Sequence, residues 1–138
     1  MYLCGASLIA PQVVLTAGHC VNNTETDKLV IRCGEWDTQT QQEELPHQER
    51  KVFQVLVIRS VRGGQSTRDL ITAPLQRHAE LDVENHHNNF ALLFLSDKFD
   101  IMDHISPICL PQPNSPPSAS EFCVSHGWGK DKFGSSGR

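Results

Sequence analysis

Residues 13–20 of the chain read Val-Val-Leu-Thr-Ala-Gly-His-Cys, so a short apolar run leads directly to a reactive side chain. The β-branched and apolar residues 13–16 predict a buried strand. Gly18 allows the chain to turn sharply just before the imidazole of His19. We therefore take His19 as the first candidate functional residue and interpret the other motifs with it in view.

A second short apolar run, residues 7–9, lies just upstream, and Ala-Pro-Gln at residues 10–12 separates the two runs as a turn. Cys4 stands at the head of this unit, and Cys20 follows the histidine at its end. A disulfide between Cys4 and Cys20 would close the hairpin-like unit.

Residues 3–20, LCGASLIAPQVVLTAGHC, resemble the opening of a trypsin-family serine protease domain, in which a C-G-G-S-L-I segment is followed by T-A-A-H-C. Ala6 and Gly18 are small-for-small departures from that pattern. The resemblance implies that Cys4 pairs with Cys20 and that His19 is the general base of a catalytic triad. The alternative interpretation is a buried, hydrogen-bonded structural histidine.

The length of the chain limits how much of that fold it can hold. A chain of 138 residues is one domain of ordinary size, whereas the two packed six-stranded barrels that the resemblance implies need about 250 residues. We therefore expect an all-β chain in which residues 1–111 form the first antiparallel barrel. Residues 112–138 would hold the connector between the barrels and the first strand of the second barrel. Because neither a signal peptide nor an activation terminus precedes Cys4, we expect a fragment or an incomplete gene model.

The chain has five cysteines, an odd number, so at least one partner is missing if the protein is oxidised and extracellular. The resemblance implies that Cys109 bridges to a segment ahead of the protease domain, as in clip-domain proteins, and that Cys123 bridges to the second half of the fold. Cys33 has no assigned partner, so a free thiol and an extra bridge both remain open. Asn22 begins an N-x-T triplet and could carry a glycan on a secreted chain, or it could simply belong to a polar loop.

Charge and hydropathy exclude two classes of function. The formal net charge is −4, and no basic stripe is present to neutralise phosphates, so we expect no binding to nucleic acid. No apolar run approaches the length that spans a bilayer, so we expect no membrane insertion. We also expect no cofactor.

Three further strands are predicted, at residues 29–32, at residues 50–58 and near Phe90. In residues 50–58, simple alternation places three side chains on one face, Val52, Gln54 and Leu56, and three on the other, Phe53, Val55 and Val57. Both faces carry apolar residues, as expected of a barrel strand that is covered on two sides.

Residues 32–52, RCGEWDTQTQQEELPHQERKV, resemble arthropod clip-domain serine protease homologues of the phenoloxidase-activating factor 2 group. Residues 104–111, HISPICLP, and 127–138, GWGKDKFGSSGR, point to the same family. Its members keep the protease fold, carry glycine in place of the nucleophilic serine, and act as cofactors for prophenoloxidase activation in melanisation. The resemblance thus implies a secreted haemolymph protein whose partners are prophenoloxidase or its activating protease.

Residues 59–88 resemble no part of that family, which has a short loop here, and we interpret them as an insertion loop or a mispredicted exon. Residues 72–83 could begin a helix with a narrow apolar stripe. The histidines of the segment, His78, His86 and His87, do not predict a metal site. Adjacent histidines point in different directions, and no carboxylate or cysteine is placed to complete a tetrahedral set.

Asn89 stands where trypsin-family chains carry the triad aspartate, in N-N-F-A-L-L-F-L rather than N-D-I-A-L-L-x-L. A carboxylate there accepts the N–H of the imidazole and stabilises its cation, whereas an amide has no charge and can present its NH₂, which holds the wrong tautomer. For this substitution the known cost in the protease family is about 10⁴ in turnover. Alternatively, Asn89 only satisfies polar neighbours of His19, or the adjoining insertion has corrupted the sequence and the true residue is aspartate.

The final GSSGR is not the nucleophile motif G-D-S-G-G, because it follows G-W-G too closely and lacks the aspartate, so we interpret Ser135 and Ser136 as loop residues. Two functions remain. The first is a non-catalytic protease homologue that docks on a partner through loops on a rigid β scaffold. The second is a fragment of an active trypsin-like endopeptidase. Asn89 and the family motifs favour the first, and we expect no hydrolysis of peptide substrates by this chain.

Overall fold

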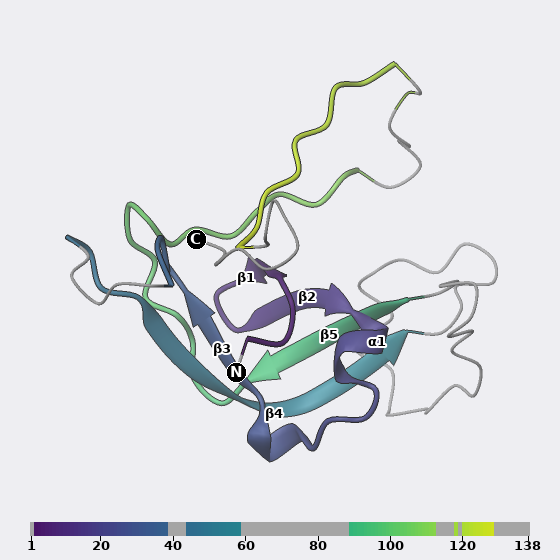
Figure 1. Cartoon of the computed structure of the whole chain (residues 1–138), viewed down its shortest axis with the longest axis vertical. Helices are drawn as coiled ribbons and strands as arrows, with labels where there is room; N and C mark the ends of the chain where they lie inside the picture. The colour runs from purple at the N-terminus through teal and green to yellow at the C-terminus, as the bar shows by residue number, and fades with distance from the viewer. Residues whose placement is uncertain (1, 39–43, 59–88, 113–117, 119, 129–138) are drawn as a thin grey trace, which may run out of the picture.

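The computed structural model describes residues 2–38, 44–58, 89–112, 118 and 120–128 (Figure 1). The predictions made for residues 59–88, including the helix at residues 72–83 and the histidines His78, His86 and His87, lie outside these described residues. So do Ser135 and Ser136.

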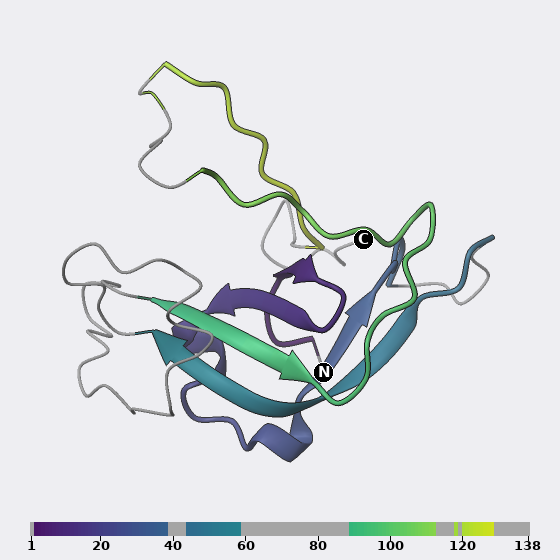
Figure 2. The same ribbon diagram turned by 180° about the vertical axis from the view of Figure 1, so that it is seen from behind.

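Within the described residues the chain forms a five-stranded antiparallel sheet in the order β1-β2-β5-β4-β3. The strands are β1 (Ala6–Ala10), β2 (Val13–Ala17), β3 (Val30–Cys33), β4 (Gln48–Ile58) and β5 (Phe90–Leu95), and the short helices α1 (Gly18–Val21) and η1 (Thr26–Lys28) lie between β2 and β3. The sheet curls, and β4 bends along its length (Figure 1 and, from behind, Figure 2). The all-β prediction is confirmed, with strand limits one or two residues from the predicted ones.

The core lies on the concave side of this curled sheet. Leu8 and Val14 of the first hairpin pack there with Leu93 and Leu95 of β5, and all four are buried. The middle position of β5 in the sheet suits its apolar run FALLFL: residues 91–93 are buried on both faces of the strand, whereas Phe90 at its start is 56% exposed.

The segment after β5 closes one end of the core. Phe99 is 1% exposed, and its N–H donates to Pro11 O at 2.7 Å. The guanidinium of Arg50 lies 5.2 Å from the centre of the Phe99 ring, a cation–π contact. Ile105 is also 1% exposed. These contacts join the β1–β2 turn, β4 and the segment that leaves β5.

The predicted faces of β4 are wrong, because the strand contains a β-bulge. Val52 pairs with Leu95, but the next partner, Phe94, lies opposite Gln54, so Phe53 is one extra residue. A single added residue reverses the alternation beyond it. Val52 therefore shares the core side with Val55 and Val57, and Phe53 is 59% exposed.

Residues 105–112 run past β1, where the N–H of Ile108 donates to Leu8 O at 2.8 Å. Residues 120–128, expected to begin a second barrel, belong to no strand in the described part of the chain, and Phe122 is 94% exposed. A strand requires a neighbour with which to form a ladder. Their assignment to a second barrel stays a prediction.

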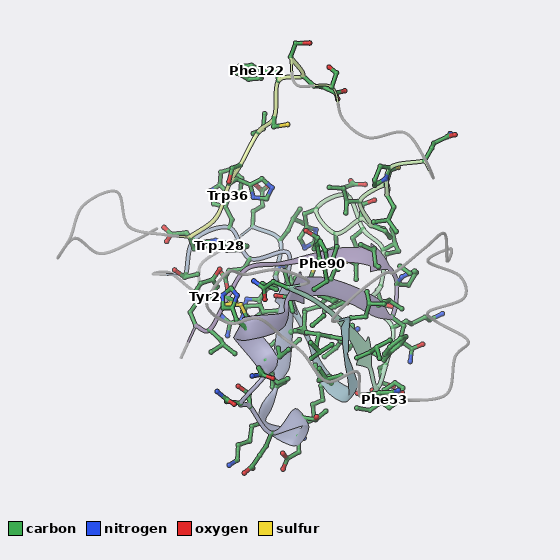
Figure 3. All side chains as sticks on the ribbon, turned by 90° about the vertical axis from the view of Figure 1, so that its right-hand side faces the viewer. Tyr2, Trp36, Phe53, Phe90, Phe122 and Trp128 are labelled. Carbon is green, nitrogen blue, oxygen red and sulfur yellow. A yellow bond between two sulfur atoms is a disulfide. The ribbon has the colours of Figure 1, made fainter. Side chains whose placement is uncertain are left out.

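The end of the described chain returns to its beginning. The ring of Trp128 meets that of Tyr2 edge-on at 6.2 Å, and Trp128 Nε1 donates to Trp36 O at 3.2 Å. Figure 3 shows these three aromatic residues along one edge of the molecule, with Phe122 farther out. Among the described residues, the helices are too short to cross a bilayer.

Candidate functional site

His19 sits in α1, directly after the end of β2. Gly18, the first residue of α1, is buried: a Cβ there would lie 3.3 Å from both Asn89 Oδ1 and Val57 Cγ1. Among the described glycines only Gly34 has a positive φ. Gly18 thus provides room for close packing rather than the sharp turn that the sequence suggested, and the chain passes from strand to helix with ordinary backbone angles.

The disulfide between Cys4 and Cys20 anchors α1 to the segment that precedes β1. Thr16 Oγ1 on β2 donates to Gly5 O at 2.9 Å and links the same N-terminal segment to β2. The resemblance had implied this cysteine pair. The ligand atoms of Cys4, His19 and Cys20 lie within 4.8 Å of one another, but the two sulfurs are bonded to each other, so they offer no thiolate to a metal.

Asn89, the residue before β5, contacts α1 through three hydrogen bonds, one with Gly18 and two with His19. The N–H of Gly18 donates to Asn89 O at 3.1 Å. The backbone N–H of His19 donates to Asn89 Oδ1 at 2.8 Å. The second amide atom, Asn89 Nδ2, lies 2.7 Å from His19 Nδ1. The two candidate site residues, 70 positions apart in the chain, are thus in direct contact.

The backbone bond determines which way the Asn89 amide faces. The N–H of His19 can only donate, so it must meet the amide oxygen, and the NH₂ group is then turned toward His19 Nδ1. An NH₂ group donates, so Nδ1 must offer its lone pair. In the neutral ring the proton therefore resides on Nε2.

This tautomer is unsuited to general-base catalysis. A triad histidine accepts the proton of the nucleophile on Nε2 while Nδ1–H is held by the carboxylate. Here Nε2 carries the hydrogen, and it lies 3.6 Å from Cys20 Sγ, within reach of a weak contact to the sulfur. The imidazole is exposed rather than buried, which does not fit the alternative of a buried structural histidine.

The remaining predicted residues lie apart from this pair. Asn22, the candidate glycan acceptor, is exposed just after α1, and Cys109 and Cys123 are exposed free thiols. Cys33 ends β3 with a free, half-buried thiol. Burial raises the pKa of this thiol, although a hydrogen bond from the Gly34 backbone acts in the opposite direction.

The sequence did not predict a second polar cluster, centred on Glu35. Its side chain is only 5% exposed, and Oε2 accepts from Arg32 Nη1 at 2.8 Å and lies 3.3 Å from His47 Nδ1. Arg32 also bonds Glu49, at 2.8 Å, and its hydrogen bonds to Glu49 and Glu35 raise the pKa of the guanidinium.

Gly34, directly before Glu35, packs closely against the segment that carries His104 and Ile105. Its φ of +82° is in the left-handed region, and a Cβ would lie 2.7 Å from His104 Cδ2 and 2.9 Å from Ile105 Cδ1. Only glycine fits such a turn against a neighbouring segment. The Gly-Glu pair of residues 34 and 35 was the sequence signal that could have indicated a packed turn.

Comparison with known proteins places this geometry in context. A family model described as Trypsin matches residues 1–137. Phenoloxidase-activating factor 2 of Galleria mellonella is 38% identical over 138 residues, which are 100% of this chain and 38% of that protein. Inactive CLIP domain-containing serine protease A28 of Anopheles gambiae is 33% identical over 131 residues, 95% of this chain and 29% of that protein.

Among solved structures, the Drosophila Grass clip serine protease of the Toll pathway matches with a TM-score of 0.60 and 26% identity, over 82% of this chain and 29% of that one. The prediction of a first barrel of the trypsin-like fold is thereby confirmed. The chain spans well under half the length of each of these proteins.

Proposed function

This chain belongs to the trypsin family, and from that premise we propose that it is part of a non-catalytic serine protease homologue that binds protein partners instead of cleaving peptide bonds. The parent protein would be a binding cofactor in an extracellular proteolytic cascade. In the most specific version of this proposal, the parent protein acts in prophenoloxidase activation, and its partner is prophenoloxidase or the activating protease. The protein would be secreted into haemolymph.

The observation that carries this proposal is the orientation of the Asn89 amide. Because the backbone N–H of His19 occupies Oδ1, the NH₂ group faces Nδ1 at 2.7 Å and the ring keeps its proton on Nε2. A nucleophilic hydroxyl placed beside Nε2 would meet an N–H donor there, whereas it needs a lone pair that can accept its proton. Selection for catalysis would not retain that arrangement, whereas selection for docking tolerates it.

The names of the relatives support the same conclusion, since one is a phenoloxidase-activating factor and another is an inactive clip-domain protease. The disulfide between Cys4 and Cys20 suits an oxidising, extracellular compartment.

The test uses the complete parent protein. We expect glycine in the G-D-S-G-G context of its transcript, no labelling by a fluorophosphonate probe, and a several-fold increase in phenoloxidase activity when it joins prophenoloxidase and the activating protease. Active trypsin is the positive control for labelling. Covalent labelling of the parent protein, or a serine in that context together with aspartate at position 89, would overturn the proposal.

The second candidate is a fragment of an active trypsin-like endopeptidase. Two observations favour it. His19 is exposed within residues 16–20, which match the family's T-A-A-H-C pattern except at Gly18, and the chain is similar to the Grass clip serine protease. Activity would then require a serine from elsewhere in the parent protein and an aspartate at position 89. The labelling experiment separates the two functions.

A further inference from the structure

One face of the helix that carries His19 is open to solvent. Gly18 and Val21, three positions apart on α1, are both buried. His19 and Asn22, also three positions apart, are both exposed. Asn22 follows the helix with φ −60° and ψ −32°, so the helical arrangement continues through it. Residues three apart on a helix have Cβ atoms about 5–6 Å from each other. Asn22 and His19 are therefore neighbours on the exposed face.

Asn22 also begins a tight turn. Thr24 N donates to Val21 O at 3.2 Å, which closes a turn with Asn22 and Asn23 at its two central positions. The backbone angles of Asn22 are those of the first central residue of a type I turn. Both central residues are exposed, so a bulky group attached to Asn22 would extend into solvent without displacing packed side chains.

The backbone conformation does not require asparagine at position 22. Asparagine occurs at the ends of helices because it tolerates the left-handed region, but a φ of −60° at Asn22 lies in the right-handed region, which most residues adopt. The residue type instead suits the triplet Asn22-Asn23-Thr24, an acceptor for N-linked carbohydrate. No other N-x-S/T triplet occurs in the 138 residues of the sequence.

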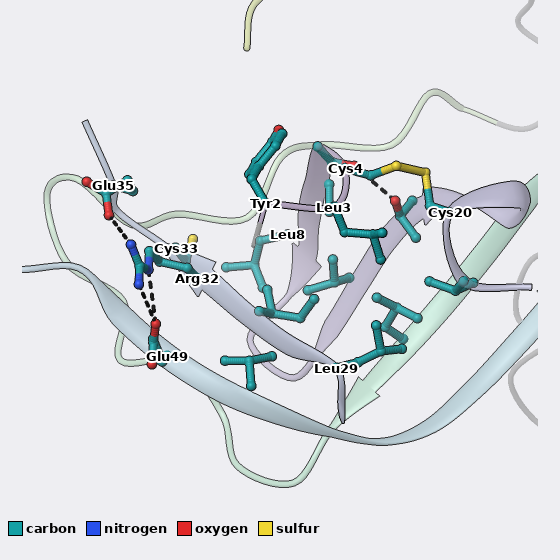
Figure 4. A pocket seen from close by; sticks show the side chains of 18 of the residues that line it. Tyr2, Leu3, Cys4, Leu8, Cys20, Leu29, Arg32, Cys33, Glu35 and Glu49 are labelled. Carbon is teal, nitrogen blue, oxygen red and sulfur yellow. Dashed lines mark hydrogen bonds and ion pairs between the residues drawn. A yellow bond between two sulfur atoms is a disulfide. The ribbon is translucent and has the colours of Figure 1, made fainter. Parts of the chain in front are cut away.

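A second observation concerns the compartment in which the chain folds. Cys20, two residues before Asn22, is bridged to Cys4 (Figure 4). Disulfides form in oxidising compartments such as the lumen of the endoplasmic reticulum, where N-linked carbohydrate is also added to nascent chains. The bridge and the triplet thus point to the same folding compartment.

We propose that Asn22 carries an N-linked oligosaccharide and that this carbohydrate shields the exposed side of His19 from macromolecules. The donor is an oligosaccharide linked to a lipid diphosphate. Asn22 Nδ2 forms a bond to C1 of the first sugar and loses one proton. The bond from C1 to the phosphate oxygen breaks, and the lipid diphosphate leaves with the electron pair. The proposal rests on the secretion that the proposed function includes.

The carbohydrate closes one approach to the site. A protein substrate is cleaved only if its peptide bond reaches the imidazole of the protease histidine. An oligosaccharide attached about one helical turn from His19 occupies that approach, so it adds a steric barrier to the chemical one that Asn89 sets. Protein partners then dock on another face of the molecule.

The first experiment determines whether the modification is present. The complete parent protein is secreted from cultured insect cells and treated with a peptide N-glycosidase in H₂¹⁸O. This enzyme converts a modified asparagine to an ¹⁸O-labelled aspartate, which mass spectrometry locates. We expect the label at position 22. Thr24→Ala should abolish it, whereas Thr24→Ser, which keeps the acceptor triplet, should retain it.

The second experiment measures how far the carbohydrate shields His19. Brief exposure to hydroxyl radicals oxidises accessible imidazole rings, and mass spectrometry after removal of the sugar gives the extent at each histidine. Oxidation of His19 should be several-fold lower in the unsubstituted protein and in Thr24→Ser than in Thr24→Ala. His126, which is exposed, is the internal reference and should be oxidised equally in all three. If Thr24→Ala does not fold, Asn22→Gln at the exposed position takes its place.

A secreted parent protein with unmodified Asn22 would overturn the proposal and leave the proposed function intact. Equal oxidation of His19 with and without the sugar would overturn the shielding. A parent protein retained in the cytosol would overturn this proposal together with the secretion on which it rests. Labelling by the fluorophosphonate probe of a protein that carries the sugar would overturn the proposed function and leave the modification site standing.

Discussion

At the residue scale, one substitution determines the chemistry of the site. Asn89 and an aspartate have almost the same shape, and both can accept the backbone N–H of His19, a bond of 2.8 Å here. They differ at the second side-chain atom, which is an NH₂ donor in asparagine and a carboxylate acceptor in aspartate. That atom alone decides which ring nitrogen keeps its hydrogen.

Asn89→Asp should therefore move the proton of neutral His19 from Nε2 to Nδ1, because the new oxygen beside Nδ1 accepts where the amide donated. Long-range ¹H–¹⁵N NMR of the imidazole distinguishes the two tautomers directly. Asn22→Asp, an exposed change of amide to carboxylate at the end of α1, is the matched control and should leave the tautomer unaltered. An Nδ1–H tautomer already present in the unsubstituted chain would contradict the assignment.

Replacing Gly34 with alanine should lower the stability of the protein more than replacing Gly18 with alanine. Gly34→Ala combines a left-handed φ of +82° with a Cβ at 2.7 Å from His104 Cδ2. We expect the free energy of unfolding to fall by about 1–2 kcal/mol because of the backbone conformation. Overpacking against His104 should lower it by about 1–3 kcal/mol more. Gly18→Ala meets neighbours at 3.3 Å with ordinary backbone angles, and it should cost less than about 1 kcal/mol. Urea unfolding of the two variants measures the difference, and equal losses would show that the φ of Gly34 is unimportant.

At the element scale, the bulge in β4 determines which side chains reach the core. Val52, Val55 and Val57 share one face only because Phe53 is an extra residue. The ring of Phe53 instead lies 6.4 Å from that of Phe94 on the outer side of the sheet. The bulge also suits the bend of β4 around the core, since bulges increase local twist.

Deleting Phe53 should therefore be tolerated. Without it, Val52, Gln54 and Val55 follow one another in regular alternation and every core residue of β4 keeps its face. Deleting Leu56, which is not a bulge residue, should turn the valines on one side of it away from the core and unfold the chain. Far-ultraviolet circular dichroism with urea titration tests both, and equal damage by the two deletions would contradict the bulge assignment.

The sequence predicted the strands well but not their details. The apolar runs at residues 13–16 and 50–58 were sufficient to locate β2 and β4, because burial on a sheet face imposes a visible pattern. The bulge left no such signal, since valine and phenylalanine suit either face. The contact between His19 and Asn89 followed from resemblance, whereas the burial of Glu35 depends on Arg32 and His47, which converge only when β3 and β4 pair.

At the scale of the whole molecule, the described residues form a curled sheet with two edges, and within this part of the chain few contacts hold the first residues against the rest. The segment that carries Tyr2 and Cys4 precedes β1 and belongs to no strand. It contacts the body through the disulfide to Cys20, the bond from Thr16 to Gly5, and the packing of Tyr2 on Trp128. The disulfide is the only covalent one of these links, and it also fixes the helix that carries His19.

Removing that disulfide should destabilise the molecule as a whole. The bridge spans 16 positions in sequence, and a closed loop of this size contributes about 3 kcal/mol, chiefly by restricting the unfolded chain. Cys4→Ser with Cys20→Ser should lower the free energy of unfolding by about that amount. Cys109→Ser with Cys123→Ser, two exposed free thiols, is the matched control and should change stability by less than about 0.5 kcal/mol. Urea unfolding of both pairs under non-reducing conditions measures the difference. If the two double variants unfold at the same urea concentration, the first hairpin and α1 are held by packing alone, and His19 does not depend on the bridge for its position.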